Sequence, residues 1–116
     1  MQSSIREQLE EMQGLGGAVF VDEVIELFFS ECDMRFVQLE KILLTGASLA
    51  EAGRIFHQVK GSAASIGTTR LHRISAVGET ASEQGDRPLA IRACLLGIQQ
   101  LELLKKTLRE WKQGLA

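Results

Sequence analysis

Residues 20–44, FVDEVIELFFSECDMRFVQLEKILL, show the strongest hydrophobic period in the chain. Apolar residues recur there at spacings of three and four, which places them along one face of an α-helix. This face is formed by Val21, Val24, Ile25, Phe28, Cys32, Phe36, Leu39 and Ile42. Thr45 and Gly46 follow and end the helix. A long helix with one apolar face must bury that face against other elements, so the stretch predicts a helical bundle.

Upstream of this helix, residues 4–13 predict a short additional helix. Gly14, Gly16 and Gly17 come directly after it. Because glycine is a poor helix former, we expect these three residues to break the helix. The short helix is then expected to pack across the bundle.

Downstream, Ser48 with Glu51 three residues later matches a capping box, so a second helix is expected to begin there. It ends at Gly67, a residue type that favours the left-handed conformation after a helix. Thr68 or Thr69 can cap a third helix. The expected buried positions of that third helix are Leu71, Ile74, Val77 and Ala81.

A turn at Gly85 and Asp86 precedes the last helix, and Pro88 occupies a first-turn position where proline is tolerated. Gly97 within this helix marks either a close contact with another helix or a glycine that is merely tolerated. The apolar stripe of the last helix consists of Leu101, Leu104, Leu108, Trp111 and Leu115.

Four amphipathic helices joined by short turns predict an all-α fold, an up-down four-helix bundle with an additional short N-terminal helix. The 116 residues suffice for one domain, so we expect a single domain over 1–116 with the bundle over about 20–115. Met1 and the compact length favour a complete protein over a domain cut from a larger one.

Charge and composition argue against several classes of function. The formal net charge is −2 with both signs mixed along the chain, which is unlike a protein whose main partner is nucleic acid. No apolar run approaches the roughly 20 residues that span a membrane, and the N-terminus lacks a signal-peptide core. Cys32 and Cys94 have no metal-binding spacing and are expected to be small buried residues in a reducing compartment, which favours the cytoplasm.

His57 is the most informative residue, because a helical wheel places it opposite the buried stripe of its helix. That stripe consists of Ala52, Ile55, Phe56, Val59, Ala63 and Ile66. Gly53, Gly61 and Ala64 lie four before, four after and seven after His57, and Lys60 lies three after it. Since residues at these spacings are neighbours on a helix, the imidazole is expected to stand on an open surface beside one cation.

Two glycines inside a helix each cost about 1 kcal/mol relative to alanine, and close approach of another protein to His57 would offset that cost. Neutral imidazole is a nucleophile that can accept a phosphoryl group. A solvated histidine without a role is the alternative, and these features alone do not separate the two. Gln58 and Ser62 point about 100° to 140° away from His57, so a role for them depends on side-chain reach.

The string HQVKGSAASIG at residues 57–67 resembles the phosphorylation motif of histidine-containing phosphotransfer (HPt) domains, HxxKGS with a glycine a few residues later. Residues 20–42 are similar to the partner helix of plant-type members. The resemblance implies that His57 is the phosphoacceptor, that Lys60 gives electrostatic support and that Gly61 keeps the surface open. Plant-type members have a run of serines where this chain has SAAS, whereas bacterial domains tolerate alanines there.

The resemblance further implies a phosphoryl carrier with no autonomous catalytic site and no cofactor of its own. A receiver-domain aspartate would donate the phosphoryl group to His57, and a second receiver domain would accept it. The implied partners are receiver domains of hybrid sensor histidine kinases and response regulators, with Mg²⁺ on the receiver. The protein is expected to be a cytoplasmic monomer, present in the nucleus too if it is plant-type. The residues expected to dock the receiver around His57 are Gly53, Gln58, Gly61, Ser62 and Ala64.

Phe20, Leu27 and Met34 form a second apolar set on the long helix, at spacings of seven. They either contact the short N-terminal helix or belong to the docking surface for a receiver domain.

Two other functions remain open at this point. The chain can be a helical interaction module whose histidine is never phosphorylated, or an enzyme in which His57 is a general base. The second has little support, because no partner acid or oxyanion site is recognisable. A metal site has little support as well, since His57 and His72 are the only histidines and no carboxylate stands at ligand spacing.

Overall fold

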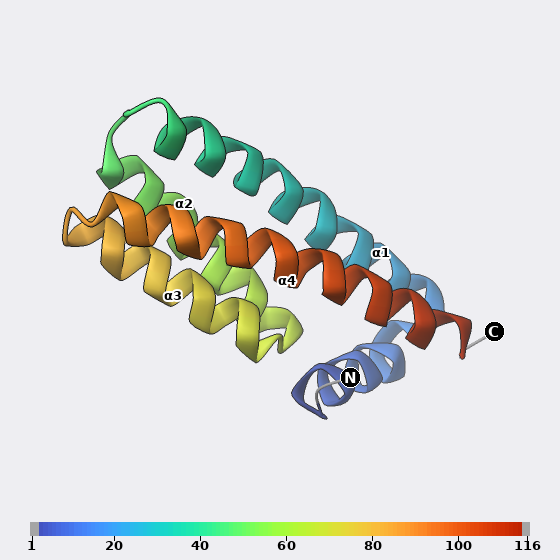
Figure 1. Cartoon of the computed structure of the whole chain (residues 1–116). Helices are drawn as coiled ribbons and strands as arrows, with labels where there is room; N and C mark the ends of the chain where they lie inside the picture. The colour runs from blue at the N-terminus through green and yellow to red at the C-terminus, as the bar shows by residue number, and fades with distance from the viewer. Residues whose placement is uncertain (1–2, 115–116) are drawn as a thin grey trace.

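The computed structural model describes residues 3–114, with side chains from residue 5 onward. These residues form four helices and no strand: α1 (Ser3–Leu44), α2 (Leu49–Ile66), α3 (Thr69–Glu83) and α4 (Arg87–Gln113). Successive helices run in alternating directions, and α1 and α4 close the ring by packing against each other (Figure 1). The predicted up-down four-helix bundle is confirmed.

Gly17 divides α1 into a short N-terminal helix and a long bundle helix. Its backbone has φ 79° and ψ −175°, a conformation that is open essentially to glycine alone. The chain turns there, and the short helix crosses the end of the bundle (Figure 1), with Ile5 and Leu9 buried. Gly14 and Gly16 were expected to break the helix too, which is wrong: both are helical, and the sharp turn is concentrated at one residue.

The helix ends largely follow the sequence expectations. Ser48 caps α2, although its hydroxyl accepts the backbone N–H of Ala50 at 3.3 Å and so does not complete the predicted pair with Glu51. Gly67 ends α2 with φ 87°, as expected for a left-handed cap. Asp86 caps α4 by accepting the N–H of Leu89 at 3.1 Å, two residues before the predicted first-turn proline, Pro88.

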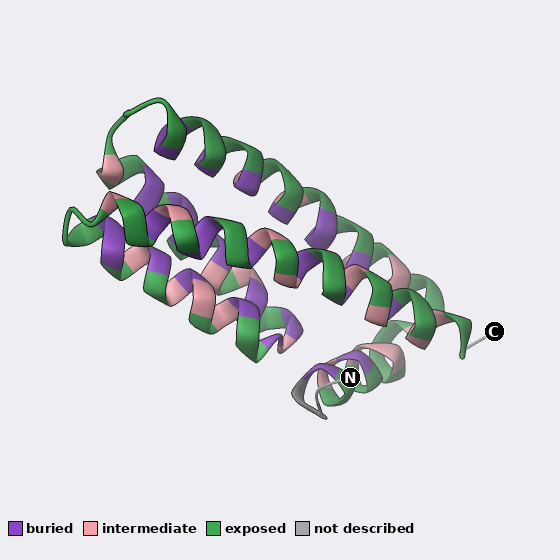
Figure 2. Ribbon diagram, viewed as in Figure 1, coloured by how far each residue is buried: buried purple, intermediate pink, exposed green. Residues whose placement is uncertain are grey.

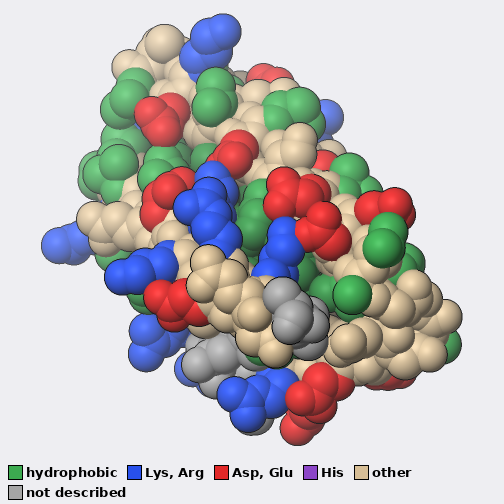
Figure 3. Space-filling view, turned by 90° about the vertical axis from the view of Figure 1, so that its right-hand side faces the viewer, with side chains coloured by type: hydrophobic (Ala, Val, Ile, Leu, Met, Phe, Trp, Pro, Cys, Tyr) green, Lys and Arg blue, Asp and Glu red, His purple; other side chains and the backbone are tan. Residues whose placement is uncertain are grey.

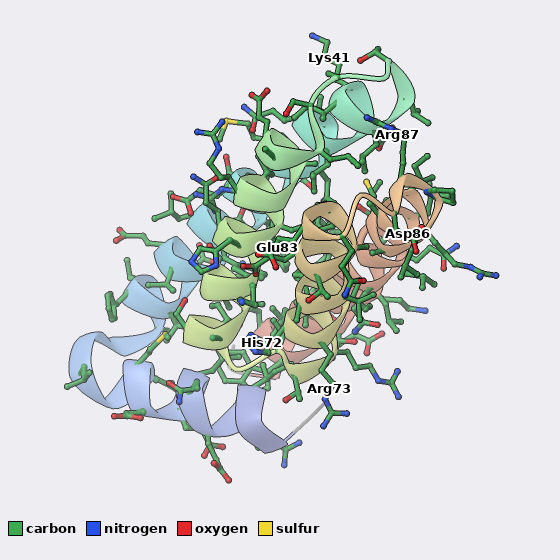
Figure 4. The ribbon with its side chains drawn as sticks, turned by 90° about the vertical axis from the view of Figure 1, so that its left-hand side faces the viewer. Lys41, His72, Arg73, Glu83, Asp86 and Arg87 are labelled. Carbon is green, nitrogen blue, oxygen red and sulfur yellow. The ribbon has the colours of Figure 1, made fainter. Side chains whose placement is uncertain are left out.

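Arg87 ties the start of α4 to the far end of α1. Its guanidinium donates to the carbonyl oxygens of Ile42 and Leu43 at 3.2 Å and of Ala47 at 2.6 Å, and it lies beside the α1–α2 loop (Figure 4). The last carbonyls of a helix have no partner within the helix, so the arginine satisfies groups that would otherwise need water.

The core lies along the inward faces of all four helices (Figure 2). Leu71 and Ala81 of α3 are buried as predicted and Ile74 is half-buried, but Val77 is 46% exposed, so its predicted burial is wrong. The buried face of α3 includes three small residues, Ser75, Gly78 and Ser82. A Cβ atom on Gly78 would lie 2.3 Å from the Phe56 ring, so this glycine lets α3 approach α2 closely.

The stripe of α4 is confirmed for Leu101, Leu104 and Leu108, which are buried, and Trp111 packs partly buried against them, whereas Leu115 lies outside the described residues. The glycine at position 97 marks a close contact, since a Cβ there would lie 2.6 Å from the Phe36 ring. Cys32 and Cys94 are buried free thiols, as predicted.

Positive and negative side chains are interspersed on the face of the molecule shown in Figure 3. Opposite charges also pair across the α1–α4 seam: Lys105 contacts Asp33 at 2.8 Å, and Lys112 contacts Asp22. The face in Figure 3 carries no concentrated basic surface. Within residues 3–114, no helix is apolar over a stretch long enough to cross a membrane.

Candidate functional site

His57 lies in the middle of α2, with its side chain 68% exposed. The predicted stripe on the opposite side of the helix is buried at every position, so the helical wheel placed the histidine correctly. His57 is exposed because it lies on the side of α2 opposite the face that packs into the core.

Glu79 of α3 meets this histidine and was not foreseen from the sequence. One of its carboxylate oxygens lies 3.0 Å from His57 Nδ1, and the other lies 2.7 Å from Lys60 Nζ. The carboxylate therefore bridges the two motif residues of α2 from the neighbouring helix. The hydrogen bond from Lys60, opposed by desolvation and supported by His57, holds the pKa of Glu79 below its ordinary value.

The contact with Glu79 decides which nitrogen of His57 is available for chemistry. A carboxylate only accepts hydrogen bonds, so Nδ1 must carry the hydrogen in the neutral ring. The lone pair is then on Nε2, and no described residue bonds to that atom. The site thus offers a nucleophilic nitrogen to the solvent side, with the ring orientation set by Glu79.

The surroundings of His57 are open on one side and closed on the other. A Cβ atom on Gly61 would meet nothing within 4 Å, and Ala64 and Gln58 are exposed, as expected for an accessible surface. Gly53 was expected on the same open face, which is wrong because it is buried: its Cβ would lie 3.4 Å from Ser82 Cβ. The α2–α3 seam covers this position.

Ser62 also lies at an edge of this surface. It is half-buried, and its hydroxyl accepts a hydrogen bond from Arg35 of α1 at 3.0 Å. It thus connects α2 to α1 and does not reach toward His57.

A hollow of about 570 Å³ lies beside His57, between α2 and α3. Buried Gly53 contributes to its lining, and exposed Glu83 lies on the α3 side, between the two helices in Figure 4. Its lining residues are Leu49, Ala50, Gly53, Arg54, His57, Gln58, Glu79, Ser82 and Glu83.

The second apolar set of α1 is only partly covered. Leu27 is 60% exposed and Met34 is 53% exposed, so the short N-terminal helix does not cover them. Phe20 is 37% exposed and packs close to Gly16, at the turn of α1. Leu27 and Met34 therefore remain available to a partner protein.

The second histidine has a structural contact. His72 of α3 is half-buried at the boundary between α2 and α3 (Figure 4), and its Nδ1 lies 3.2 Å from the carbonyl oxygen of Lys60. Among the side chains described from residue 5 to 114, no cluster of His, Cys, Asp and Glu has an arrangement that could hold a metal ion.

A family model described as "Hpt domain" matches residues 23–113. The chain belongs to the Hpt domain family. The match includes α2 with His57, Lys60 and Gly61, as well as Glu79 on α3. The sequence resemblance stated above is thereby confirmed for most of the chain.

Two curated relatives come from Arabidopsis thaliana. Histidine-containing phosphotransfer protein 2 is 27% identical over 104 residues, which are 88% of this chain and 64% of that protein. Pseudo histidine-containing phosphotransfer protein 6 is 29% identical over 97 residues, 82% of this chain and 60% of that protein. The chain thus spans less than two thirds of the length of either relative.

Two solved structures share the HPt fold. A histidine-containing phosphotransfer protein from maize superimposes with a TM-score of 0.83 at 24% identity, covering 95% of this chain and 83% of the maize chain. A protein from rice, described as a putative histidine-containing phosphotransfer protein, gives a TM-score of 0.82 at 22% identity, with 92% and 78% covered. At these identities the likeness establishes the fold and says nothing further about chemistry.

Proposed function

We infer that the protein is a histidine phosphotransfer carrier in a multistep phosphorelay, with His57 as the phosphoacceptor. The observation that carries this inference is the exposed His57 ring whose Nδ1 is held by Glu79, which leaves Nε2 free for attack. Membership of the Hpt domain family supports the same role.

The transfer is a displacement at phosphorus. The Nε2 lone pair of His57 forms the N–P bond while the bond between phosphorus and the receiver's aspartate oxygen breaks, and the aspartate leaves as a carboxylate. The ring becomes positively charged because Nδ1 keeps its hydrogen, and the Glu79 carboxylate stabilises this charge at 3.0 Å. The reverse reaction passes the phosphoryl group to a second receiver. Mg²⁺ is expected on the receiver domain, so the chain itself is a carrier without a cofactor.

The surface around His57 fits the approach of a second protein. In-line transfer requires the receiver's aspartate within a few ångströms of the histidine nitrogen, and Gly61 puts no side chain in that path. Gln58, Ala64 and the edge residue Ser62 would border the receiver, while Gly53 would contribute from the hollow. Exposed Leu27 and Met34 of α1 would extend the contact as an apolar patch.

The proposed partners are receiver domains of hybrid sensor histidine kinases and of response regulators. We expect the protein to act as a monomer in the cytoplasm, and also in the nucleus if it follows the plant-type pattern.

A helical interaction module without transfer is the second candidate. One relative is named a pseudo histidine-containing phosphotransfer protein, so family membership alone does not establish transfer. In this chain the motif histidine is present and is held by a carboxylate, which favours the carrier.

The test is incubation with a receiver domain that carries labelled phosphate. Wild-type protein should take up label that is labile in acid and stable in base, as expected for a phosphorylated histidine nitrogen. His57→Gln should abolish the label with an unchanged helical circular dichroism spectrum, and His72→Gln should label like wild type. Label that persists in His57→Gln would disprove the assignment.

A further inference from the structure

Arg54 is an exposed cation one turn before His57 on the same helix. Residues three apart on a helix are surface neighbours, with Cβ atoms about 5–6 Å apart. Arg54 and His57 both line the 570 Å³ hollow between α2 and α3. In the part of the chain that the structure describes, the Arg54 guanidinium has neither a hydrogen bond nor an ion pair.

Lys60, the cation of the sequence motif, is in a different position. Its ammonium lies 2.7 Å from the Glu79 carboxylate, and its side chain is 28% exposed. The positive charge of Lys60 is therefore already balanced within the protein. A phosphoryl group on His57 carries about two negative charges, and the positive charge gained by the ring offsets only one of them. Arg54 is a neighbouring cation that is free to balance the remaining charge.

The remaining charges around the hollow increase the need for such a cation. Glu83 lines the hollow from α3 and is exposed, and Glu79 lies against Nδ1 of the histidine. Both carboxylates are negatively charged and would repel a phosphoryl group on His57. Gly53 lines the hollow without a side chain of its own.

On the basis of the function inferred above, we propose that the Arg54 guanidinium binds the phosphoryl group of phosphorylated His57 and stabilises the carrier's loaded form. Guanidinium presents paired N–H donors that match two phosphoryl oxygens. Arg54 makes and breaks no covalent bond in the transfer. Its role is to shift the equilibrium between phospho-aspartate on the receiver and phosphohistidine on the carrier toward phosphohistidine.

The experiment measures the equilibrium constant for transfer between a phosphorylated receiver and the carrier, with concentrations low enough that both proteins are mostly unbound. This constant compares the free species only, so a residue that merely contacts the receiver in the complex changes the rate and leaves the constant unchanged. We expect Arg54→Gln to lower the constant about fivefold, as for the loss of one partly solvated charged contact. Arg54→Lys should recover part of the loss.

A second readout needs no receiver. Protein phosphorylated by phosphoramidate is titrated by phosphorus NMR, and removal of a bound guanidinium should raise the pH at which the phosphoryl signal titrates. Arg92→Gln on α4, an exposed arginine outside the hollow, is the matched control and should leave both readouts unchanged.

The outcomes separate this proposal from the function on which it rests. If wild-type protein takes no label on His57 from any receiver or from phosphoramidate, the carrier function itself fails. If wild-type protein is labelled and Arg54→Gln shows the same equilibrium constant and the same titration, the carrier function stands and the role of Arg54 is refuted.

Discussion

The α2–α3 seam and the outer face of α2 each hold a glycine inside a helix, and the two have opposite surroundings. A Cβ atom on Gly78 in the seam would lie 2.3 Å from the ring of Phe56, which is fully buried. A Cβ atom on Gly61 on the outer face would meet nothing within 4 Å. The first glycine is required by packing, whereas the second leaves a surface open without any benefit to the fold. Their difference separates what the bundle needs from what the site needs.

The largest effect is expected in the seam. Gly78→Ala places a methyl group inside the contact distance of a ring that cannot move outward, and overpacking of this kind costs more than the helix propensity that alanine returns. We expect a loss of about 2 kcal/mol in the free energy of unfolding, measured by urea denaturation. Gly61→Ala is the matched control and should be as stable as wild type or more so. A Gly78→Ala protein of unchanged stability would mean that α2 and α3 leave enough space for a methyl group between them.

On the outer face the effect should fall on transfer. Gly61→Gln adds a side chain beside His57, so we expect at least about tenfold slower phosphorylation by a receiver. Thermal stability should match or exceed that of wild type, because glutamine is the better helix former. Phosphoramidate, a small donor, should label the variant nearly as well as wild type. Transfer from the receiver at the wild-type rate would show that the open surface is not used for docking.

Lys60→Ala tests the ion pair at the boundary between the α2–α3 seam and the outer face of α2. Glu79 of the seam contacts both Lys60 and His57 there. Because this lysine is paired with Glu79 at 2.7 Å, its loss should slow transfer only about threefold and leave the bundle folded. The effect should shrink as salt concentration rises, since surface charges are screened. Transfer rates equal to wild type at every salt concentration would exclude an electrostatic role for Lys60.

The smallest effect concerns the pH dependence of stability at Glu79. Its pKa is lowered in the folded protein, chiefly by the hydrogen bond from Lys60. The carboxylate therefore contributes stability above its ordinary pKa of 4.5, and this contribution is lost as the pH falls through the lower, folded pKa. The difference in unfolding free energy between wild type and Glu79→Gln should be largest near neutral pH and should decrease below about pH 4. A difference that is constant over this range would rule out the pairing.

The sequence predicted the features that follow from the period of one helix. The exposure of His57 and the burial of the opposite stripe depend only on the geometry of α2, and both are observed. The long helix of residues 20–44 was predicted for the same reason. The contact at Gly97 was one of two alternatives that the sequence left open, and the structure decides between them.

Features that depend on how two helices face each other were missed. Hydrophobicity favoured Val77 for the core, but close packing of α3 against Phe56 turned the smaller Gly78 inward. The same rotation of α3 brings Glu79 to His57 and covers Gly53. The hydrophobic period of α2 or of α3 alone cannot predict this rotation, because it is determined by how the side chains of the two helices pack against each other.

The buried cysteines have a practical consequence. Burial raises the pKa of Cys32 to about 12 and that of Cys94 to about 11. At neutral pH both side chains are therefore present almost entirely as the unreactive thiol. An alkylating reagent therefore modifies these side chains chiefly through open states of the bundle. The labelling rate then follows the population of the open state, or the opening rate itself when alkylation is faster than reclosing. Two native residues thus report the opening of the core without any engineered label, and neither lies on the helix that carries His57.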